Sequence, residues 1–168
     1  DSAYGKMLNM ATSYGKLIDK EEEHLNDGIT QKFLTTEQYT AILGKMEITG
    51  LEDFYYYVVD KSGIIRYHAN ESYIGKPNMN SAITEVVAGI AKGTIPDNLC
   101  MEFEEDGETM YASYYVTANR SIMIICASSK ELTRPIVEMS MMALGVALVV
   151  LALVVIVSTV VIRRFTKP

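Results

Sequence analysis

Apolar side chains recur at alternating spacings of four and three along the first two dozen residues of the chain. This period is typical of an amphipathic helix that packs one stripe against a core. A charge run at 21–24 and a turn signal at 26–28 would end that helix, so we expect it over residues 2–24. The stripe offers a seam either for a partner subunit or for the domain's own sheet. Its members are Ala3, Met7, Met10, Tyr14 and Leu17.

Capping signals mark two further helices. Thr35 is followed three positions later by Gln38, a pair that resembles a capping box, so we expect a helix over residues 36–46. Asn80 or Ser81 can cap a third helix, which carries one apolar face and is ended by Gly93.

Elsewhere the pattern is that of β-strands, with aromatic and β-branched runs separated by short turns. Short turns between the last three runs require antiparallel pairing, so the layout is α+β. Cys100 and Cys126 would lie on strands with another strand between them, roughly 9 to 10 Å apart, and we expect two free thiols in the core. The expected strands cover residues 54–60, 64–68, 99–104, 109–116 and 122–127.

Residues 139–162 form a run of 24 positions without an ionisable side chain. A helix of that length spans the ~30 Å hydrocarbon core of a bilayer. Arg163, Arg164 and Lys167 follow the run directly, and basic flanks of this kind stay cytoplasmic. We therefore expect a membrane helix over residues 136–162, with the preceding domain outside the cell.

Two features of the flanks add to this expectation. The sequence starts at Asp1 without an initiator Met or an apolar leader, which predicts a piece of a longer protein. Pro135 disfavours a helical conformation at Arg134, which predicts a corner between the domain and the membrane helix.

Charge and motif content exclude several classes of protein. The first 138 residues hold 12 basic and 21 acidic side chains, a net charge of −9, whereas a nucleic-acid-binding protein needs a basic face. The sequence has two histidines and no HExxH, GxSxG or P-loop motif, so we expect no enzyme and no catalytic residue. We also expect no cofactor and no metal site, because the acidic run at 102–106 lacks calcium-loop spacing and fits a solvated hairpin tip.

Several segments, taken in order, resemble single Cache (PAS-like) extracellular sensor domains, in particular those of bacterial methyl-accepting chemotaxis receptors. The last segment resembles the start of a HAMP linker. The matching segments are YVVDKSG (57–63), YH (67–68), IGKP (74–77), YASY (111–114), residues 121–125 and 128–132, and RRFTKP (163–168).

The resemblance implies an α+β fold with a PAS-like, five-stranded antiparallel sheet, a long N-terminal helix and a C-terminal transmembrane helix. It places a sensor domain at 1–134, with its helix at 1–27 and its core at 51–132, before the membrane helix at 136–162 and a cytoplasmic linker at 163–168. It also implies a chemoreceptor of the cell membrane that binds a small molecule outside the cell, contacts the lipid bilayer and works as a homodimer. A histidine kinase or diguanylate cyclase could carry the same domain. A ligand-free, membrane-anchored interaction ectodomain is the alternative from another class.

Ligand contacts can also be carried over from the related citrate and dicarboxylate sensor kinases. Their ligand-contacting His lies six residues before an Ile-Gly pair, which is His68 here, while the position of an Arg three residues earlier is Ile65. On the fourth strand, two cationic positions of the citrate pattern fall on Tyr111 and Ser113. The implied ligand-binding set is Tyr55, Tyr57, His68, Tyr111, Ser113 and Tyr115.

Compared with the sites of those kinases, this set keeps one ionisable contact, the histidine, and lacks three cationic side chains. A tricarboxylate bound here would therefore leave negative charges without partners. We expect a small ligand with at most one negative charge, such as a short monocarboxylate or hydroxy acid. A neutral planar ring bonded by tyrosines is the alternative. A sensor should have a closed pocket of ~100 to 300 Å³ lined by His68, Tyr111 and Ser113, whereas a ligand-free ectodomain should have a solid core. In that second case His68 would bond to backbone and the tyrosines would be core side chains.

Overall fold

The computed structural model describes residues 2–26 and 32–165. The chain forms two compact units, residues 1–132 and 133–168, which are described separately below. Most of the turn signal expected at 26–28, and the end of the expected linker at 166–168, lie outside the described residues.

The first unit is built on an antiparallel sheet of five strands in the order β2-β1-β5-β4-β3. The α+β class and the antiparallel pairing predicted from the sequence are confirmed. Asp106 and Gly107, both with positive φ, form the two-residue turn between β3 and β4, a turn that matches the twist of the paired strands. The strands are β1 (Phe54–Val59), β2 (Ile65–His68), β3 (Cys100–Glu105), β4 (Glu108–Val116) and β5 (Ile122–Ser128).

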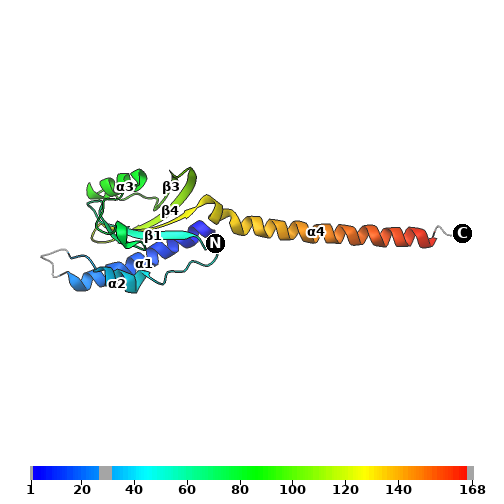
Figure 1. Ribbon diagram of the computed structural model, residues 1–168, viewed down its shortest axis with the longest axis horizontal. Coiled ribbons are helices and arrows are strands. Elements are labelled where there is room, and N and C mark those ends of the chain that lie inside the picture. Colours follow the sequence, from blue (N-terminus) through cyan, green and yellow to red (C-terminus); the bar gives the residue numbers. More distant parts are fainter. Residues whose placement is uncertain (1, 27–31, 166–168) are drawn as a thin grey trace. The chain divides into compact units, whose positions relative to one another are not determined.

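Helices cover both faces of this sheet (Figure 1). Helices α1 (Ala3–Leu25) and α2 (Thr36–Leu43) lie on one face, and α3 (Ser81–Ala91) lies on the other. All three helices were predicted, and the capping box at Thr35 is present in full. Helix α2 is shorter than expected because it ends at Gly44, whose N–H still bonds to the carbonyl of Thr40.

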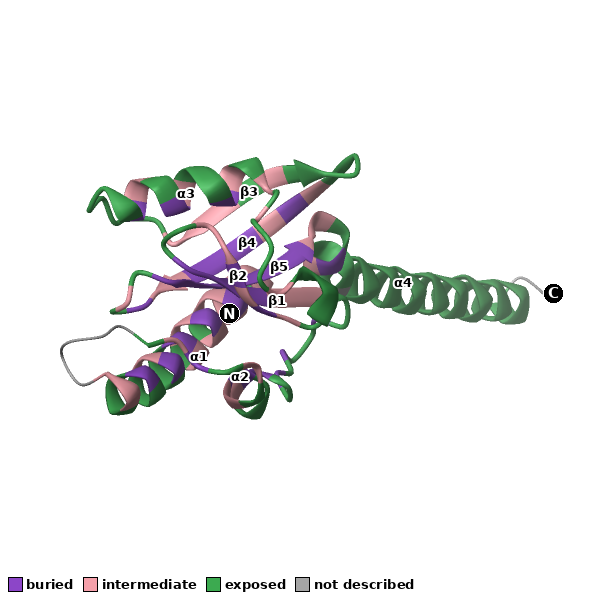
Figure 2. Cartoon of the chain, turned by 60° about the vertical axis from the view of Figure 1, so that its left-hand side comes forward, coloured by how far each residue is buried: buried purple, intermediate pink, exposed green. Residues whose placement is uncertain are grey.

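Each face of the sheet has its own apolar core. In the core beneath α1, Met7 and Ala11 are fully buried against the sheet residues Val58 and Met123. Four members of the expected stripe, Ala3, Met7, Met10 and Tyr14, belong to this core, so they pack on the domain's own sheet, whereas Leu17 is 48% exposed. The buried line of α1 runs instead through Met7, Ala11, Gly15, Ile18 and Glu22, and Figure 2 shows the buried residues along one side of the helix. The core beneath α3 includes Ile83, Val87, Ile90, Ile124 and Cys126.

The two cysteines lie on the predicted strands, Cys100 on β3 and Cys126 on β5 with β4 between them, and both thiols are free, although only Cys126 has the predicted core position. Cys126 is buried, whereas Cys100 is only partly so.

In the second unit, the apolar run is helical, as predicted. Helix α4 (Ser129–Phe165) begins at the end of β5 and continues through position 135. The expected corner at Arg134 is therefore wrong, because a proline near the start of a 37-residue helix removes one backbone hydrogen bond out of many. Within the described residues, α4 is the one helix long and apolar enough to cross a membrane, judged by length and composition.

Candidate functional site

Strand alternation places Tyr55 and Tyr57 on the α3 face of the sheet. Both pack with the core beneath α3. Tyr57 lies opposite His68 in the β1–β2 pair, and their ring centroids are 5.8 Å apart. These three predicted site residues are therefore brought together.

They line an open cavity of about 440 Å³ on that face. Its floor is made by β1 and β2, and its walls come from the short 3-10 helix η1 (Glu71–Tyr73), from the segment leading into α3, and from the end of β3. The lining residues are Tyr55, Tyr57, Ile65, His68, Tyr73, Pro77, Asn78, Met79, Asn80 and Glu105.

Backbone hydrogen bonds fasten the wall segment to β2. The N–H of Gly75 donates to the carbonyl of Ile65 at 2.8 Å, and the N–H of Ile65 donates to Lys76 at 2.9 Å. Gly75 has a φ of 80°, a conformation that costs glycine little and other residues more. The Ile-Gly-Lys-Pro segment thereby folds back over the sheet edge and carries Pro77 and Asn78 to the cavity.

His68 has a fixed orientation in the cavity wall. Its Nδ1 accepts a hydrogen bond of 2.9 Å from the N–H of Asn70. Burial lowers the pKa of His68, so the ring is neutral at pH 7 and carries its proton on Nε2. His68 can therefore donate one hydrogen bond to a ligand without supplying a positive charge.

Glu105, a residue that the sequence did not single out for the site, reaches the same cavity from β3. Its Oε2 accepts a hydrogen bond of 2.7 Å from the hydroxyl of Tyr55. Burial raises the pKa values of the Tyr55 and Tyr57 hydroxyls, and raises the pKa of the Cys126 thiol beside them to about 12. The two hydroxyls and the thiol are therefore neutral at pH 7, and the carboxylate of Glu105 supplies the charge beside them.

The other half of the predicted set lies on the opposite face. Tyr111, Ser113 and Tyr115 pair with Ala127, Ile125 and Met123, all members of the core beneath α1. The prediction that they share a pocket with His68 is therefore wrong. The expected register of β4 is shifted by one residue, since the side chains on the α3 face are those of Met110, Ala112 and Tyr114. The expectation of a closed pocket is wrong as well, because the cavity is open.

Each of the three side chains has a structural partner on the α1 face. Tyr111 makes an edge contact with the ring of Tyr4, with centroids 5.7 Å apart. Ser113 is fully buried and lies 3.5 Å from the sulfur of Cys100. The hydroxyl of Tyr115 donates to Asp19 on α1 at 2.9 Å.

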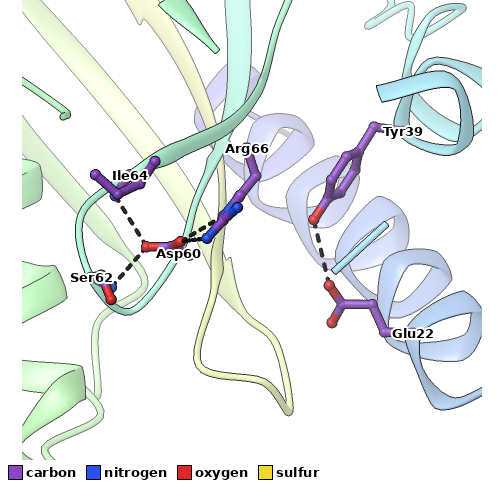
Figure 3. A network of polar contacts seen from close by, with 6 residues as sticks. All are labelled: Glu22, Tyr39, Asp60, Ser62, Ile64 and Arg66. Atoms are coloured by element: carbon purple, nitrogen blue, oxygen red, sulfur yellow. Dashed lines mark hydrogen bonds and ion pairs between the residues drawn. The ribbon is translucent and has the colours of Figure 1, made fainter. Parts of the chain in front are cut away.

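Arg66 does not line the cavity, although it lies on β2 between Ile65 and Tyr67, where the pairing with β1 shifts register. It pairs with the buried Asp60 at 2.6 Å and stacks on the ring of Phe33. Asp60 in turn accepts hydrogen bonds from the backbone N–H groups of Ser62 and Ile64, which closes the β1–β2 turn (Figure 3). Arg66 therefore organises a turn and leaves the cavity without a cation.

Glu22 forms a second polar contact drawn in Figure 3. It is 2% exposed and accepts hydrogen bonds from the Tyr39 hydroxyl at 3.4 Å and from Asn119 Nδ2 at 2.7 Å. Burial raises its pKa to about 7, with a further upward effect from the charge of Asp19. This carboxyl thus ties α1 to α2 and to the β4–β5 turn.

Another cavity, of about 380 Å³, opens beside the β4–β5 turn and is lined in part by Asp19, Ile95 and Arg120. Its carboxylate, Asp19, already accepts hydrogen bonds from Tyr115 and from the N–H of Ala118. The cavity on the α3 face is lined by more aromatic and amide side chains than this second cavity.

Sequence reasoning missed Tyr73, Asn78 and Glu105 as cavity residues and assigned Asn80 to helix capping, a role it does have. The Ile-Gly turn signal could have pointed to Tyr73 and Asn78, which flank it. Nothing local marks Glu105, which meets Tyr55 across 50 residues of chain. Among the described residues, no group of three or more His, Cys, Asp or Glu side chains could hold a metal ion.

No family model matches the chain, and no curated protein matches it. Among solved structures it is similar to the extracellular domain of mmHK1S-Z3, described as a histidine kinase, with 16% identity and a TM-score of 0.50 over 62% of this chain and 40% of that one. It is also similar to the ligand-binding domain of Mlp24 with asparagine, with 11% identity and a TM-score of 0.43 over 60% of this chain and 38% of that one. A third similar structure is the Escherichia coli DcuS sensor domain, with 13% identity and a TM-score of 0.42 over 81% of this chain and 98% of that one.

The chain thus spans about two fifths of the length of the first two of these structures. At these identities the likeness concerns the fold alone. Together with the five-stranded sheet and the long N-terminal helix, it gives the chain the PAS-like fold of extracellular sensor domains.

Proposed function

We propose that the chain is the small-molecule sensor region of a transmembrane chemoreceptor, with the cavity of Tyr55, Tyr57 and His68 as its ligand site. The observation that carries the proposal is this cavity, where aromatic rings and polar groups from β1, β2, η1 and the start of α3 converge. Small-molecule sites commonly combine apolar walls with a few placed polar groups. The backbone bond of His68 and the burial of Tyr57 match what a ligand-free ectodomain predicts, but the solid core that it also predicts does not describe this face.

The covalent path from the site to α4 supports a signalling role. Cys126 on β5 lies opposite Tyr55, and β5 ends at Ser128, directly before α4 begins. A ligand that shifts β1 can therefore displace the strand that leads into the proposed membrane helix, a small movement of the kind that switches interfaces.

The orientation, oligomer and output of the receptor belong to the same proposal. The basic residues Arg163 and Arg164 after the apolar run favour a cytoplasmic C-terminal end and a sensor unit outside the cell. We propose a homodimer whose α4 helices lie in the lipid bilayer. A chemotaxis output follows from the resemblance of the sensor motifs to those of chemotaxis receptors, and a kinase or cyclase output is the alternative.

The expected carboxylate ligand loses its main support. That expectation assumed that His68 shared the site with Tyr111 and Ser113 and could supply positive charge. In the cavity, His68 is neutral and Glu105 adds a negative charge, so an anionic ligand would meet an unfavourable field.

A ligand screen on the full chain in detergent micelles tests the proposed function. All 11 tyrosines precede the apolar run, so tyrosine fluorescence reports on the sensor unit during thermal unfolding. A ligand at 100 times its dissociation constant should stabilise the folded unit by ~2.7 kcal/mol. The proposal predicts at least one stabilising compound whose effect is lost in Tyr73→Ala. A broad library of charged and neutral metabolites without any such compound would contradict it.

A further inference from the structure

The charge of the cavity on the α3 face restricts what it can bind. Its described lining residues include one carboxylate, Glu105, and neither lysine nor arginine. Lys76 lies next to the wall, but the contact it makes to β2 is through its backbone carbonyl, which accepts from Ile65. With a neutral His68, the cavity carries a net negative charge.

Acidic residues next to Glu105 in the sequence add to that field. Glu104 and Asp106 flank Glu105 at the tip of the β3–β4 hairpin, and both are exposed. Glu108, which also lies at the tip, is paired with Lys130. A cluster of one sign of charge at a cleft raises the local concentration of oppositely charged ligands.

Four rings form a continuous wall inside the cavity. The centroid of Tyr55 lies 6.1 Å from that of Tyr57, Tyr57 lies 5.8 Å from His68, and His68 lies 4.8 Å from Tyr73. The faces of tyrosine rings attract cations that approach within ~6 Å of the centroid. Several rings beside one carboxylate therefore suit a cation that also has an apolar surface.

Glu105 can take a second donor. Its Oε2 accepts the Tyr55 hydroxyl, which fixes the carboxylate at the cavity, and a carboxylate has acceptor capacity on both oxygens. A bare metal ion is a poorer occupant, because the described residues offer no cluster of three metal-ligating side chains and a hydrated ion gains little from the rings.

We propose that this cavity binds a small organic ammonium ion, with an ammonium N–H bonded to Glu105 and the apolar part of the ligand against Tyr57 and Tyr73. The inference rests on the proposed sensor function and specifies its ligand class. Tyr55 acts as a positioning residue, because its hydroxyl holds the carboxylate. The neutral His68 and the Asn78 amide are left to bond polar groups elsewhere on the ligand.

Two series of matched compounds test the charge of the ligand by calorimetry on the full chain in micelles. The first series is benzylamine, benzyl alcohol and benzoate, and the second is propylamine, propanol and propionate. In each series the body is nearly constant while the charge changes from +1 to 0 to −1. The proposal predicts that the amine of at least one series binds about tenfold more tightly than its alcohol, and that the acid binds most weakly.

A pair of variants then tests the position of the charge. Glu105→Gln should weaken amine binding about tenfold and remove the preference of the amine over the alcohol. Glu104→Gln makes the same change of net charge at the neighbouring position, whose side chain bonds to Thr109 and does not line the cavity. This control should change amine binding by less than twofold.

The failure of this inference differs from the failure of the proposed function. Equal or tighter binding of an alcohol or acid, lost in Tyr73→Ala, would overturn the ammonium assignment while the sensor function stands. Amine binding that is equally weakened in Glu104→Gln and Glu105→Gln would also overturn it, since only the general field would then matter. If neither series binds and the wider library is silent as well, both proposals fall.

Discussion

Gly15 on α1 lies so close to Tyr115 on β4 that a β-carbon at position 15 would be 2.1 Å from a carbon of the tyrosine ring. The ring is held there from its other end, because the Tyr115 hydroxyl donates to Asp19 one turn further along the helix. The close approach of α1 to the sheet therefore depends on a glycine in the middle of the helix.

The first prediction follows from this contact. Gly15→Ala should lower the free energy of unfolding by about 1 to 3 kcal/mol, because the added methyl group forces the helix away from the sheet. Elsewhere in a helix the same change is favourable. Gly5→Ala, whose β-carbon would meet its nearest atom at 3.5 Å, should be neutral or stabilising. Urea unfolding followed by tyrosine fluorescence measures both variants, and equal stability changes at the two positions would refute the packing argument.

The second prediction concerns pH. The pKa of Glu22 is about 7 in the folded unit, against 4.5 without burial, so the folded state holds this proton more tightly than the unfolded state does. The stabilisation from the protonated carboxyl is fully present below pH 4.5 and is lost as the pH rises toward 7. Between pH 5 and pH 7 the loss is about 2 kcal/mol.

Two variants isolate this carboxyl from other titrating groups. Glu22→Gln should flatten the fall in unfolding free energy between pH 5 and pH 7, whereas Glu23→Gln, at the exposed neighbouring position, should keep it. Urea titrations at pH 5, 6 and 7 give the slope of unfolding free energy against pH for the unsubstituted protein and for each of the two variants. An unchanged slope in Glu22→Gln would show that the buried carboxyl does not cause the pH dependence.

The third prediction concerns the β1–β2 turn. Asp60 accepts hydrogen bonds from two backbone N–H groups and also pairs with Arg66. Arg66, in contrast, is partly exposed and also stacks on Phe33. Asp60→Ala leaves two backbone N–H groups and the Arg66 guanidinium without their acceptor and should cost ~3 kcal/mol, while Arg66→Ala leaves the carboxylate bonded to both N–H groups and should cost ~1 kcal/mol. The difference is measured by urea unfolding at pH 7. A larger loss in Arg66→Ala would mean that the ion pair, and not the turn, is the main contribution of Asp60.

The sequence predicts the helices and strands of the first unit well, because their periods are strong and their caps are local. Thr35 with Gln38 marks the start of α2, and Asn80 marks the start of α3, since each cap is read from residues a few positions apart. The expected corner at Arg134 failed because a local preference was outweighed by a long continuous helix.

The face of β4 could not be read from its residues. Helices cover both sides of the sheet, so β4 has buried or aromatic residues at odd and even positions alike, as Tyr111 and Tyr114 illustrate. Alternation between apolar and polar residues, the signal that fixes a register, is missing from such a strand. Half of the candidate site was therefore misplaced by one residue, while Tyr55, Tyr57 and His68 were placed together.

Glu105 shows a second limit of sequence reasoning. Its neighbours in the sequence are acidic and exposed, so the segment is typical of a solvated hairpin tip. The contact with Tyr55 arises only when β1 and β3 have both joined the sheet, on either side of β5 and β4. Chemistry that depends on such long-range pairing leaves no local pattern.

The central claim, that the α3 face holds the ligand site and the α1 face does not, is tested most directly by one pair of variants. Tyr73→Ala removes a ring from the cavity wall, and Tyr111→Ala makes the same change on the opposite face. Calorimetry with the compound that most raises the unfolding midpoint should show binding weakened about tenfold in Tyr73→Ala and by less than twofold in Tyr111→Ala. Binding lost in Tyr111→Ala and retained in Tyr73→Ala would contradict the account.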